Sequence, residues 1–135
     1  MVLNRTEVIE IVNNLKLPID KYVITSGSAM VLHNLREMTN DVDITVNSDL
    51  FEQFVEKGYE VKYHKINDIK SCTLIDLSDE IQLICIDEIP KKYVTIVDGI
   101  PTQTIEHLLE FKLGLNREKD QSDINILKKY LGDVL

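Results

Sequence analysis

Two aspartates separated by one residue, Asp41 and Asp43, are the clearest chemical signal in this sequence. They lie in the segment DVDITV, whose alternation of polar and β-branched residues predicts a strand. Residues two apart on a strand point to the same face, so both carboxylates are expected side by side, with Val42 and Ile44 turned to the core. Paired carboxylates suit Mg²⁺, which keeps several waters and often completes its shell with substrate phosphates. Two such ions can stabilise both the attacking and the leaving oxygens at a phosphorus centre.

A glycine and a serine, Gly27 and Ser28, precede that strand at the start of a short helical segment. Glycine lets the backbone approach a ligand closely and adopt conformations that a side chain would forbid. Ser28 adds a hydroxyl, and the helix that follows directs free N–H groups and its positive dipole end outward, which suits phosphate. The residues from Ala29 to Asn40 allow about two helical turns and a return to a neighbouring strand. We therefore expect the phosphate site and the metal site to face each other at one end of a sheet.

Each half of this pattern also has a plain structural interpretation. Gly-Ser before a helix is commonly a turn and cap, and Asp-x-Asp on a strand is commonly a solvated edge. The two halves occur together here, between a strand–helix junction and a second strand, and this combination favours a functional site.

Length and composition indicate a single domain over residues 1–135 with its own core. The net charge is −8, and residues 1–90 hold 16 acidic but 8 basic side chains, which argues against a protein that grips long phosphate backbones. The two cysteines are too few and too far apart for a zinc site. No signal peptide and no apolar stretch of about 20 residues is found, so we expect a cytoplasmic protein without a membrane partner.

The remaining pattern predicts an α/β (α+β) fold. Helices are expected over residues 4–17, 28–35, 48–58, 104–115 and 122–132. Strands are expected over 22–25, 41–46, 59–66, 70–77 and 80–86, and two further short strands within 92–103. Asn4 and Glu7 have capping-box spacing, while Ser78-Asp79 and Asp98-Gly99 are turn signals between strands. This order predicts a mixed sheet with helices mainly on one face and a helical pair at the C-terminus.

The segment SGSAMVLHNLREMTNDVDITV resembles the Gly-Ser-to-Asp-x-Asp signature of the nucleotidyltransferase superfamily that includes DNA polymerase beta. The likeness is strongest to a small bacterial and phage branch of AbiEii-like abortive-infection toxins and minimal nucleotidyltransferases. Those proteins read Gly-Gly/Ser-Thr/Ser-Ala-Leu, then Arg and Thr shortly before Asp-Ile-Asp, and Arg36 and Thr39 occupy comparable places here. HLLEFKLGLNREKDQSDINIL is similar to the branch's Lys, Arg-x-Lys-Asp and Asp-Ile segment.

The resemblance implies a role for each matching residue. Gly27 and Ser28 would hold nucleotide phosphates, and Asp41 and Asp43 would bind Mg²⁺, two ions being expected with the nucleotide. Lys112 would reach the triphosphate from the penultimate helix; its alternative is an ordinary exposed lysine. Asp120 or Asp123 would lie near the site and orient Lys112 or Arg117. Arg36 and Thr39 would join the nucleotide-binding set, although pairing of Arg36 with Glu37 or the sheet edge is an equal alternative.

One position departs from the superfamily pattern. A third carboxylate is usual on a later strand, where it shares a metal and helps to deprotonate the acceptor hydroxyl. In DEIQLICID the matching residue is Gln82, which is neutral and cannot act as a base near neutral pH. Glu80, two residues earlier, is the preferred catalytic substitute, and Asp76 and Asp87 are weaker candidates.

The resemblance therefore implies an enzyme that moves a nucleoside monophosphate from an NTP to a hydroxyl and releases pyrophosphate. The acceptor is left open between a protein side chain, an RNA end such as that of tRNA, and a small molecule. A chain this short has little room for an acceptor domain, so a homodimer or a partner protein is an open expectation. The alternative is a degenerate, non-catalytic module that binds nucleotide or a protein partner in a toxin–antitoxin or phage-defence setting.

Overall fold

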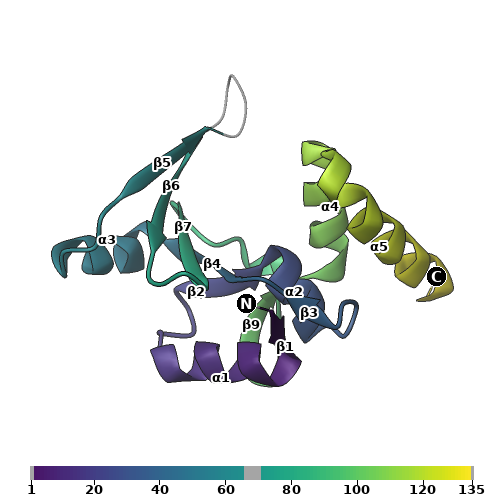
Figure 1. Cartoon of the computed structure of the whole chain (residues 1–135), viewed down its shortest axis with the longest axis horizontal. Coiled ribbons are helices and arrows are strands. Elements are labelled where there is room, and N and C mark those ends of the chain that lie inside the picture. Colours follow the sequence, from purple (N-terminus) through teal and green to yellow (C-terminus); the bar gives the residue numbers. More distant parts are fainter. Residues whose placement is uncertain (1, 66–70, 135) are drawn as a thin grey trace.

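A computed structural model describes residues 2–65 and 71–134, which form a mixed seven-stranded sheet with helices around it (Figure 1). The strands follow in the order β5 (Lys62–Lys65), β6 (Ser71–Asp76), β7 (Ile81–Ile86), β4 (Val42–Asn47), β2 (Tyr22–Thr25), β9 (Ile100–Gln103) and β8 (Val94–Val97). A separate small ladder joins β1 (Leu3–Asn4) and β3 (Met38–Thr39). The α-helices are α1 (Arg5–Leu15), α2 (Ser26–Leu32), α3 (Ser48–Glu56), α4 (Ile105–Leu115) and α5 (Gln121–Val134). Two 3₁₀ turns, η1 (Lys91–Tyr93) and η2 (Glu118–Asp120), precede β8 and α5.

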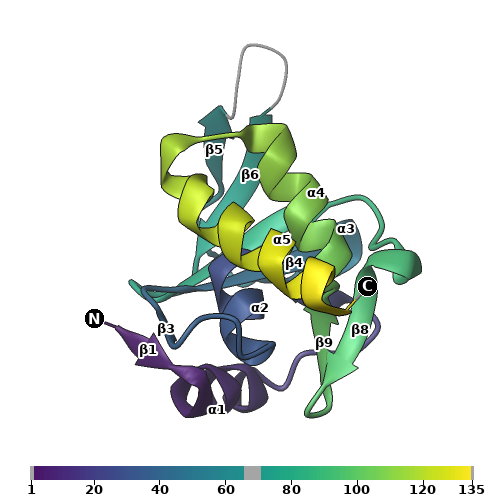
Figure 2. The same cartoon turned by 90° about the vertical axis from the view of Figure 1, so that its right-hand side faces the viewer.

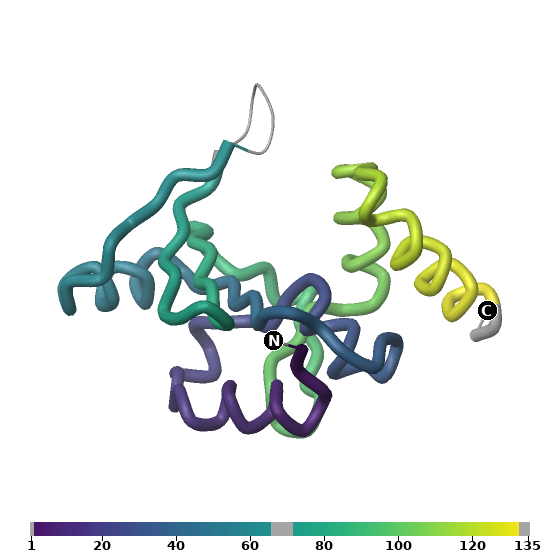
Figure 3. The backbone as a smooth tube through the Cα atoms, in the orientation of Figure 1, coloured from purple at the N-terminus to yellow at the C-terminus, as the bar shows by residue number. Residues whose placement is uncertain are grey.

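The central strand β4 carries the alternation predicted for DVDITV. Val42, Ile44 and Val46 are fully buried in the main core, while the residues between them face the other side and stay partly exposed. β4 is antiparallel to β2 and parallel to β7, so neighbours on both sides fix its register. Figure 3 shows the chain leaving β2, forming α2 and returning beside β2 as β4. Asp41 stands immediately before the first residue of the strand.

The C-terminal helical pair lies on the opposite side of the sheet from α1, on the side toward which the β5–β6 hairpin also rises (Figure 1). Figure 2 shows α4 and α5 side by side over the region of α2 and β4. A second core fixes this position, because Leu108 and Leu127 of the pair pack on Ala29 and Met30 of α2. The helix that follows the Gly-Ser turn is thus held by both the sheet and the helical pair.

Most predicted elements are confirmed. Asn4 and Glu7 form the expected capping box, and Asp98 and Gly99 both have positive φ in the turn between β8 and β9. α5 differs: it continues past Gly132 to Val134, because no left-handed cap interrupts it there. Residues 66 and 70, which belong to two predicted strands, lie outside the described residues. Across the described chain, every helix is too short or too polar to cross a bilayer.

The contact between α2 and the helical pair generates a stability prediction. Leu108→Ala removes a fully buried side chain from the second core, and we expect the free energy of unfolding to fall by about 2–5 kcal/mol in urea denaturation. Leu113→Ala on the same helix is the matched control, because Leu113 is 44% exposed; it should change the value by less than about 0.5 kcal/mol. Equal losses in the two variants would contradict this packing.

Candidate nucleotide and metal site

The turn between β2 and α2 is the first component of the site. Ser26, not Gly27, adopts the left-handed conformation, with φ of 59°, and Thr25 makes no side-chain cap to the helix. Gly27 is needed for a different reason than a special φ. A Cβ at this position would lie 2.8 Å from Arg36 Nη1 and 3.2 Å from Thr39 Oγ1. The glycine therefore makes room for a guanidinium that passes directly across the turn.

The hydroxyl of Ser28 fastens this turn to β4. Its oxygen donates to the carbonyl of Thr25 at 2.8 Å and accepts from the backbone N–H of Asp43 at 3.1 Å, and the side chain is fully buried. A serine hydroxyl has one hydrogen to donate, and here it is used inside the protein. The sequence pattern suggested a hydroxyl free to contact phosphate, but in the structure both hydrogen bonds of this hydroxyl are made inside the protein.

Asp41 and Asp43 lie directly beside the turn. Thr25 pairs with Asp43 across the β2–β4 ladder, so their side chains share one face of the sheet. Thr39 is buried and donates its hydroxyl to the carbonyl of Asp41 at 3.1 Å. The predicted convergence of the Gly-Ser turn and the two acids is therefore present. Hydrogen bonds of Ser28 and Thr39 to the backbone of the two aspartates stabilise it.

The two carboxylates differ in their surroundings. Asp41 is exposed, whereas burial raises the pKa of Asp43 to about 6, the negative charge of Asp41 adds to the rise, and Lys112 and Lys119 oppose it. Within residues 2–65 and 71–134, no three His, Cys, Asp or Glu side chains form a metal-binding cluster. A pair of repelling carboxylates still fits Mg²⁺, because this ion binds through one or two carboxylates, substrate phosphates and water.

Gln82 occupies the third position of this face. It pairs with Asp43 on one side and with Asp76 on the other, so the three side chains form one row across β4, β7 and β6. Gln82 donates its amide to Asp76 at 2.9 Å, and Lys62 donates to the same carboxylate at 2.9 Å. These two hydrogen bonds lower the pKa of Asp76, which therefore stays anionic and is already engaged.

Glu80 lies at the edge of this row, in the turn before β7. Its carbonyl accepts from Val42 N–H at 2.7 Å, directly beyond Val42–Ile81, which is the last pair of the two strands at this end. A hollow of about 400 Å³ lies here, with Asp41, Asp76, Glu80 and Gln82 in its wall. Asp87 instead follows the far end of β7, so the structure does not bring this weaker candidate to the site.

Lys112 is not an ordinary exposed lysine. It is 3% exposed on α4, and its Nζ lies 3.2 Å from Asp123 and 3.6 Å from Asp120. Asp123 also accepts from Arg36 Nη1 at 3.4 Å, and Asp120 forms a two-pronged pair with Arg117 at 2.7 and 3.0 Å. Although burial raises the pKa of Asp120, Arg117 and Lys112 lower it overall. Both aspartates thus pair with basic side chains, and Asp123 links Lys112 to Arg36 at the turn.

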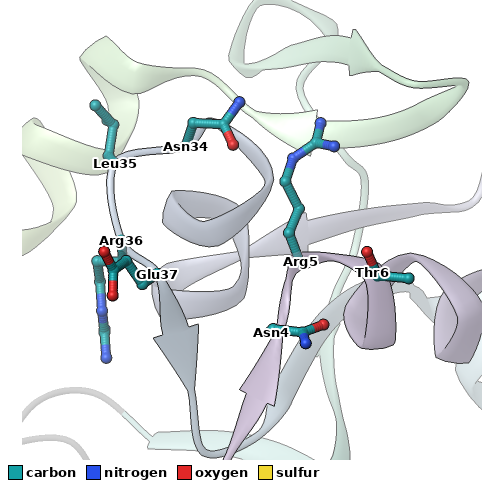
Figure 4. A pocket seen from close by; sticks show the side chains of 7 residues that line it. All are labelled: Asn4, Arg5, Thr6, Asn34, Leu35, Arg36 and Glu37. Carbon is teal, nitrogen blue, oxygen red and sulfur yellow. The ribbon is translucent and has the colours of Figure 1, made fainter.

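A second hollow of about 360 Å³ lies between α1 and the segment after α2 (Figure 4). Its two arginines point away from each other: Arg5 pairs with Asp98 and also donates to Leu32 O, while Arg36 extends to Asp123. The two guanidinium groups therefore do not converge on a common point in this hollow.

The arrangement of these elements is shared with two solved structures. TM1012 of Thermotoga maritima, a candidate nucleotidyltransferase, is similar with a TM-score of 0.61 and 18% identity, over 97% of this chain and 96% of that chain. ANT(2″)-Ia in complex with adenylyl-2″-tobramycin is similar with a TM-score of 0.59 and 17% identity, over 95% of this chain and 87% of that chain. The chain has the nucleotidyltransferase fold. No protein-family model matches the sequence, and no curated protein matches it.

The nucleotidyltransferase fold predicted from the Gly-Ser and Asp-x-Asp segments is therefore confirmed, with its mixed sheet and C-terminal helical pair. Sequence reasoning missed one residue of the site, Gln103, whose side chain accepts from Ser26 N–H at 3.0 Å. The only signal for it was an amide at the end of a predicted strand, which is not distinctive.

The raised pKa of Asp43 generates a pH prediction. Below about pH 4 the folded and unfolded states both largely keep the proton of Asp43. Between about pH 4 and 6 the unfolded state releases this proton while the folded state keeps it, so the folded state loses stability as pH rises through this range. We expect Asp43→Asn to stabilise the protein by up to about 3 kcal/mol above pH 7 and by less than about 1 kcal/mol at pH 4, in urea denaturation with EDTA. Asp41→Asn should stabilise less, and a gain independent of pH would contradict the assignment.

Proposed function

We propose that the protein is a Mg²⁺-dependent nucleotidyltransferase that moves a nucleoside monophosphate from an NTP to a hydroxyl acceptor. The observation that carries this proposal is the convergence of the 26–28 turn with Asp41 and Asp43 through the buried Ser28 hydroxyl. The backbone N–H groups of Gly27 and Ser28 are assigned to phosphate oxygens, since the N–H of Ser26 donates to Gln103, and the carboxylates supply the ligands that Mg²⁺ prefers. When bound, Mg²⁺ would neutralise phosphate charge and stabilise the attacking and leaving oxygens.

In the proposed reaction the acceptor oxygen attacks the α-phosphorus of the nucleotide in line. A bond forms between this oxygen and the α-phosphorus. The bond between the α-phosphorus and the oxygen that bridges to the β-phosphate breaks, and pyrophosphate leaves with the electron pair. We assign Lys112 and Arg36 to neutralise the developing charge on pyrophosphate. Asp123 pairs with both cations, and Thr39 lies with Arg36 against Gly27. Glu80 is assigned to accept the hydroxyl proton, because Gln82 cannot accept it and Asp76 is already engaged by Lys62.

The acceptor is proposed as a hydroxyl on a small molecule, a protein side chain or an RNA end. Similarity to ANT(2″)-Ia, whose complex contains adenylyl-2″-tobramycin, supports a small molecule among these classes. A hollow of about 400 Å³ borders Asp41, Glu80 and Gln82, which leaves room for part of an acceptor and makes a homodimer or a separate partner protein the proposed source of any larger acceptor surface.

A second candidate function is a non-catalytic module that binds nucleotide or a protein partner, as in a toxin–antitoxin or phage-defence pair. Gln82 favours it, because the row Asp43–Gln82–Asp76 has an amide at the position of a catalytic carboxylate. The two candidates differ in outcome: the enzyme transfers label to an acceptor, whereas the module binds nucleotide and transfers none.

The test of transfer uses α-³²P-labelled NTPs, Mg²⁺ and cell extract. We expect Asp41→Asn/Asp43→Asn to reduce labelling of the acceptor at least about 100-fold, because both metal ligands lose their charge. The matched control is Asp49→Asn/Asp87→Asn, two exposed aspartates away from the site, which should label like the wild type. Nucleotide binding without transfer by the wild type would favour the module, and equal labelling by all variants would contradict the assigned site.

A second test concerns the third position of the row. Gln82→Asp places a carboxylate beside Asp76 and Asp43, so we expect a lower melting temperature in EDTA and recovery with Mg²⁺ that exceeds the wild-type response. Gln82→Asn, which stays neutral, is the control and should show no added Mg²⁺ response. If Gln82→Asp responds to Mg²⁺ no more than Gln82→Asn does, the row does not face the proposed metal position.

A further inference from the structure

Gln103 is the last residue of β9, is 3% exposed, and contacts both ends of α2. At the start of the helix its Oε1 accepts from Ser26 N–H at 3.0 Å. At the end of the helix its backbone carbonyl lies 2.7 Å from Nε2 of His33, the C-cap residue, and a carbonyl can only accept, so this nitrogen donates. One residue therefore fixes the short helix that carries the proposed phosphate turn.

The contact with Ser26 matters because this residue is strained. Ser26 has φ of 59°, and a left-handed conformation is unfavourable for a residue with a Cβ. Such a conformation persists only when its surroundings hold it in place. Oε1 of Gln103 is the group that holds the N–H of Ser26, directly before the amides of Gly27 and Ser28.

The other end of the same amide contacts a histidine. Nε2 of Gln103 lies 2.9 Å from Nδ1 of His107, in the first turn of α4. Since Ser26 N–H can only donate, it must face Oε1, and Nε2 of Gln103 must then donate to His107. Nδ1 of His107 is therefore an acceptor, and the ring carries its hydrogen on Nε2.

We propose that Gln103 is a positioning residue for the phosphate turn, and that it holds the turn correctly only while His107 is neutral. This inference rests on the proposed function for its link to nucleotide, but its geometry does not. A proton on Nδ1 would place two donors against each other. Gln103 would then either lose its hydrogen bond to His107 or rotate its amide. Rotation would turn the NH₂ group toward the N–H of Ser26, where neither group can accept a hydrogen bond.

The surroundings of His107 favour the neutral ring. Tyr93 stacks on it with centroids 3.8 Å apart and planes 13° apart, and Phe111 lies beside it at 6.3 Å. Burial lowers the pKa of His107, Glu110 of α4 opposes this, and Lys92 of η1 adds to it. The position of the ring in the first turn of α4 also disfavours a positive charge. From α2, His33 contributes a ring that donates to the backbone of Gln103.

The first test needs no nucleotide. In ¹H–¹⁵N NMR from pH 5 to 8, we expect His107 to titrate below the ordinary value of about 6.5 and the Ser26 amide to shift with the same midpoint. In His107→Phe, which keeps a ring against Tyr93 but removes the acceptor, the Ser26 amide should not show this midpoint. A Ser26 amide that ignores the titration of His107 in the wild type would overturn the proposal.

Substitution of Gln103 gives the sharper comparison. Gln103→Glu keeps an acceptor for Ser26 N–H but offers His107 a carboxylate, so we expect the pKa of His107 to rise by about one pH unit or more. Gln103→Met removes both contacts and should uncouple Ser26 from His107. Gln53→Glu, an exposed change of the same kind on α3, should leave His107 as it is in the wild type. A His107 titration that is the same in Gln103→Glu and Gln53→Glu would overturn the proposal.

The catalytic readout separates positioning from general stability. If nucleotide transfer is measured, Gln103→Met should raise KM for the NTP about 2- to 10-fold, the loss expected for one hydrogen bond at the turn, with a smaller change in kcat. Wild-type KM should rise as pH falls through the His107 midpoint, and His107→Phe should make this rise smaller, since protonation of Asp43 also raises KM in this pH range. Absence of transfer in every protein would count against the proposed function alone, because the NMR results would still decide the role of Gln103.

Discussion

The hydroxyl of Ser28 is the contact on which the rest of the site depends. It joins the carbonyl of Thr25, at the end of β2, to the N–H of Asp43, in β4. Ser28 is fully buried, so leaving its hydroxyl without a partner would cost the desolvation of a polar group, of the order of 1–3 kcal/mol. Through this one side chain, the turn and the strand with the paired carboxylates keep a fixed spacing. The proposed phosphate side and the proposed cation side of the site are therefore positioned as one unit.

A chain of alternating charges surrounds this unit. Asp123 lies between Lys112 and Arg36, and Arg36 crosses the turn where only a glycine leaves room. Across the site, Asp43 is a carboxyl whose charged form is disfavoured by burial and by Asp41. Positive groups thus gather near the turn and repelling negative groups at the strand. A triphosphate with its cations is complementary to both, because its anionic part suits the first and its metal part suits the second.

The fold was largely predictable because its signals are local. DVDITV alternates as a strand must, the spacing of Asn4 and Glu7 forms a capping box, and Asp98-Gly99 forms a turn with two positive φ angles. The approach of the turn to the two acids was also predictable, since a short helix returns the chain to a neighbouring strand.

Other parts of the site depend on contacts between distant segments, which no local pattern specifies. The pairing of Gln82 with Asp76 depends on the register of the β6–β7 hairpin, and it leaves Asp76 engaged by an amide and by Lys62. The burial of Lys112 depends on how α4 and α5 pack. Gln103 reaches Ser26 across 77 positions, so its role could only be found from the structure.

The account can be tested most directly by a crystal structure with a non-hydrolysable NTP and Mg²⁺. We expect phosphate oxygens on the backbone N–H groups of Gly27 and Ser28, and at least one Mg²⁺ ion between the phosphates and the carboxylates of Asp41 and Asp43. A nucleotide bound elsewhere, or bound at the turn with no cation on either aspartate, would contradict it.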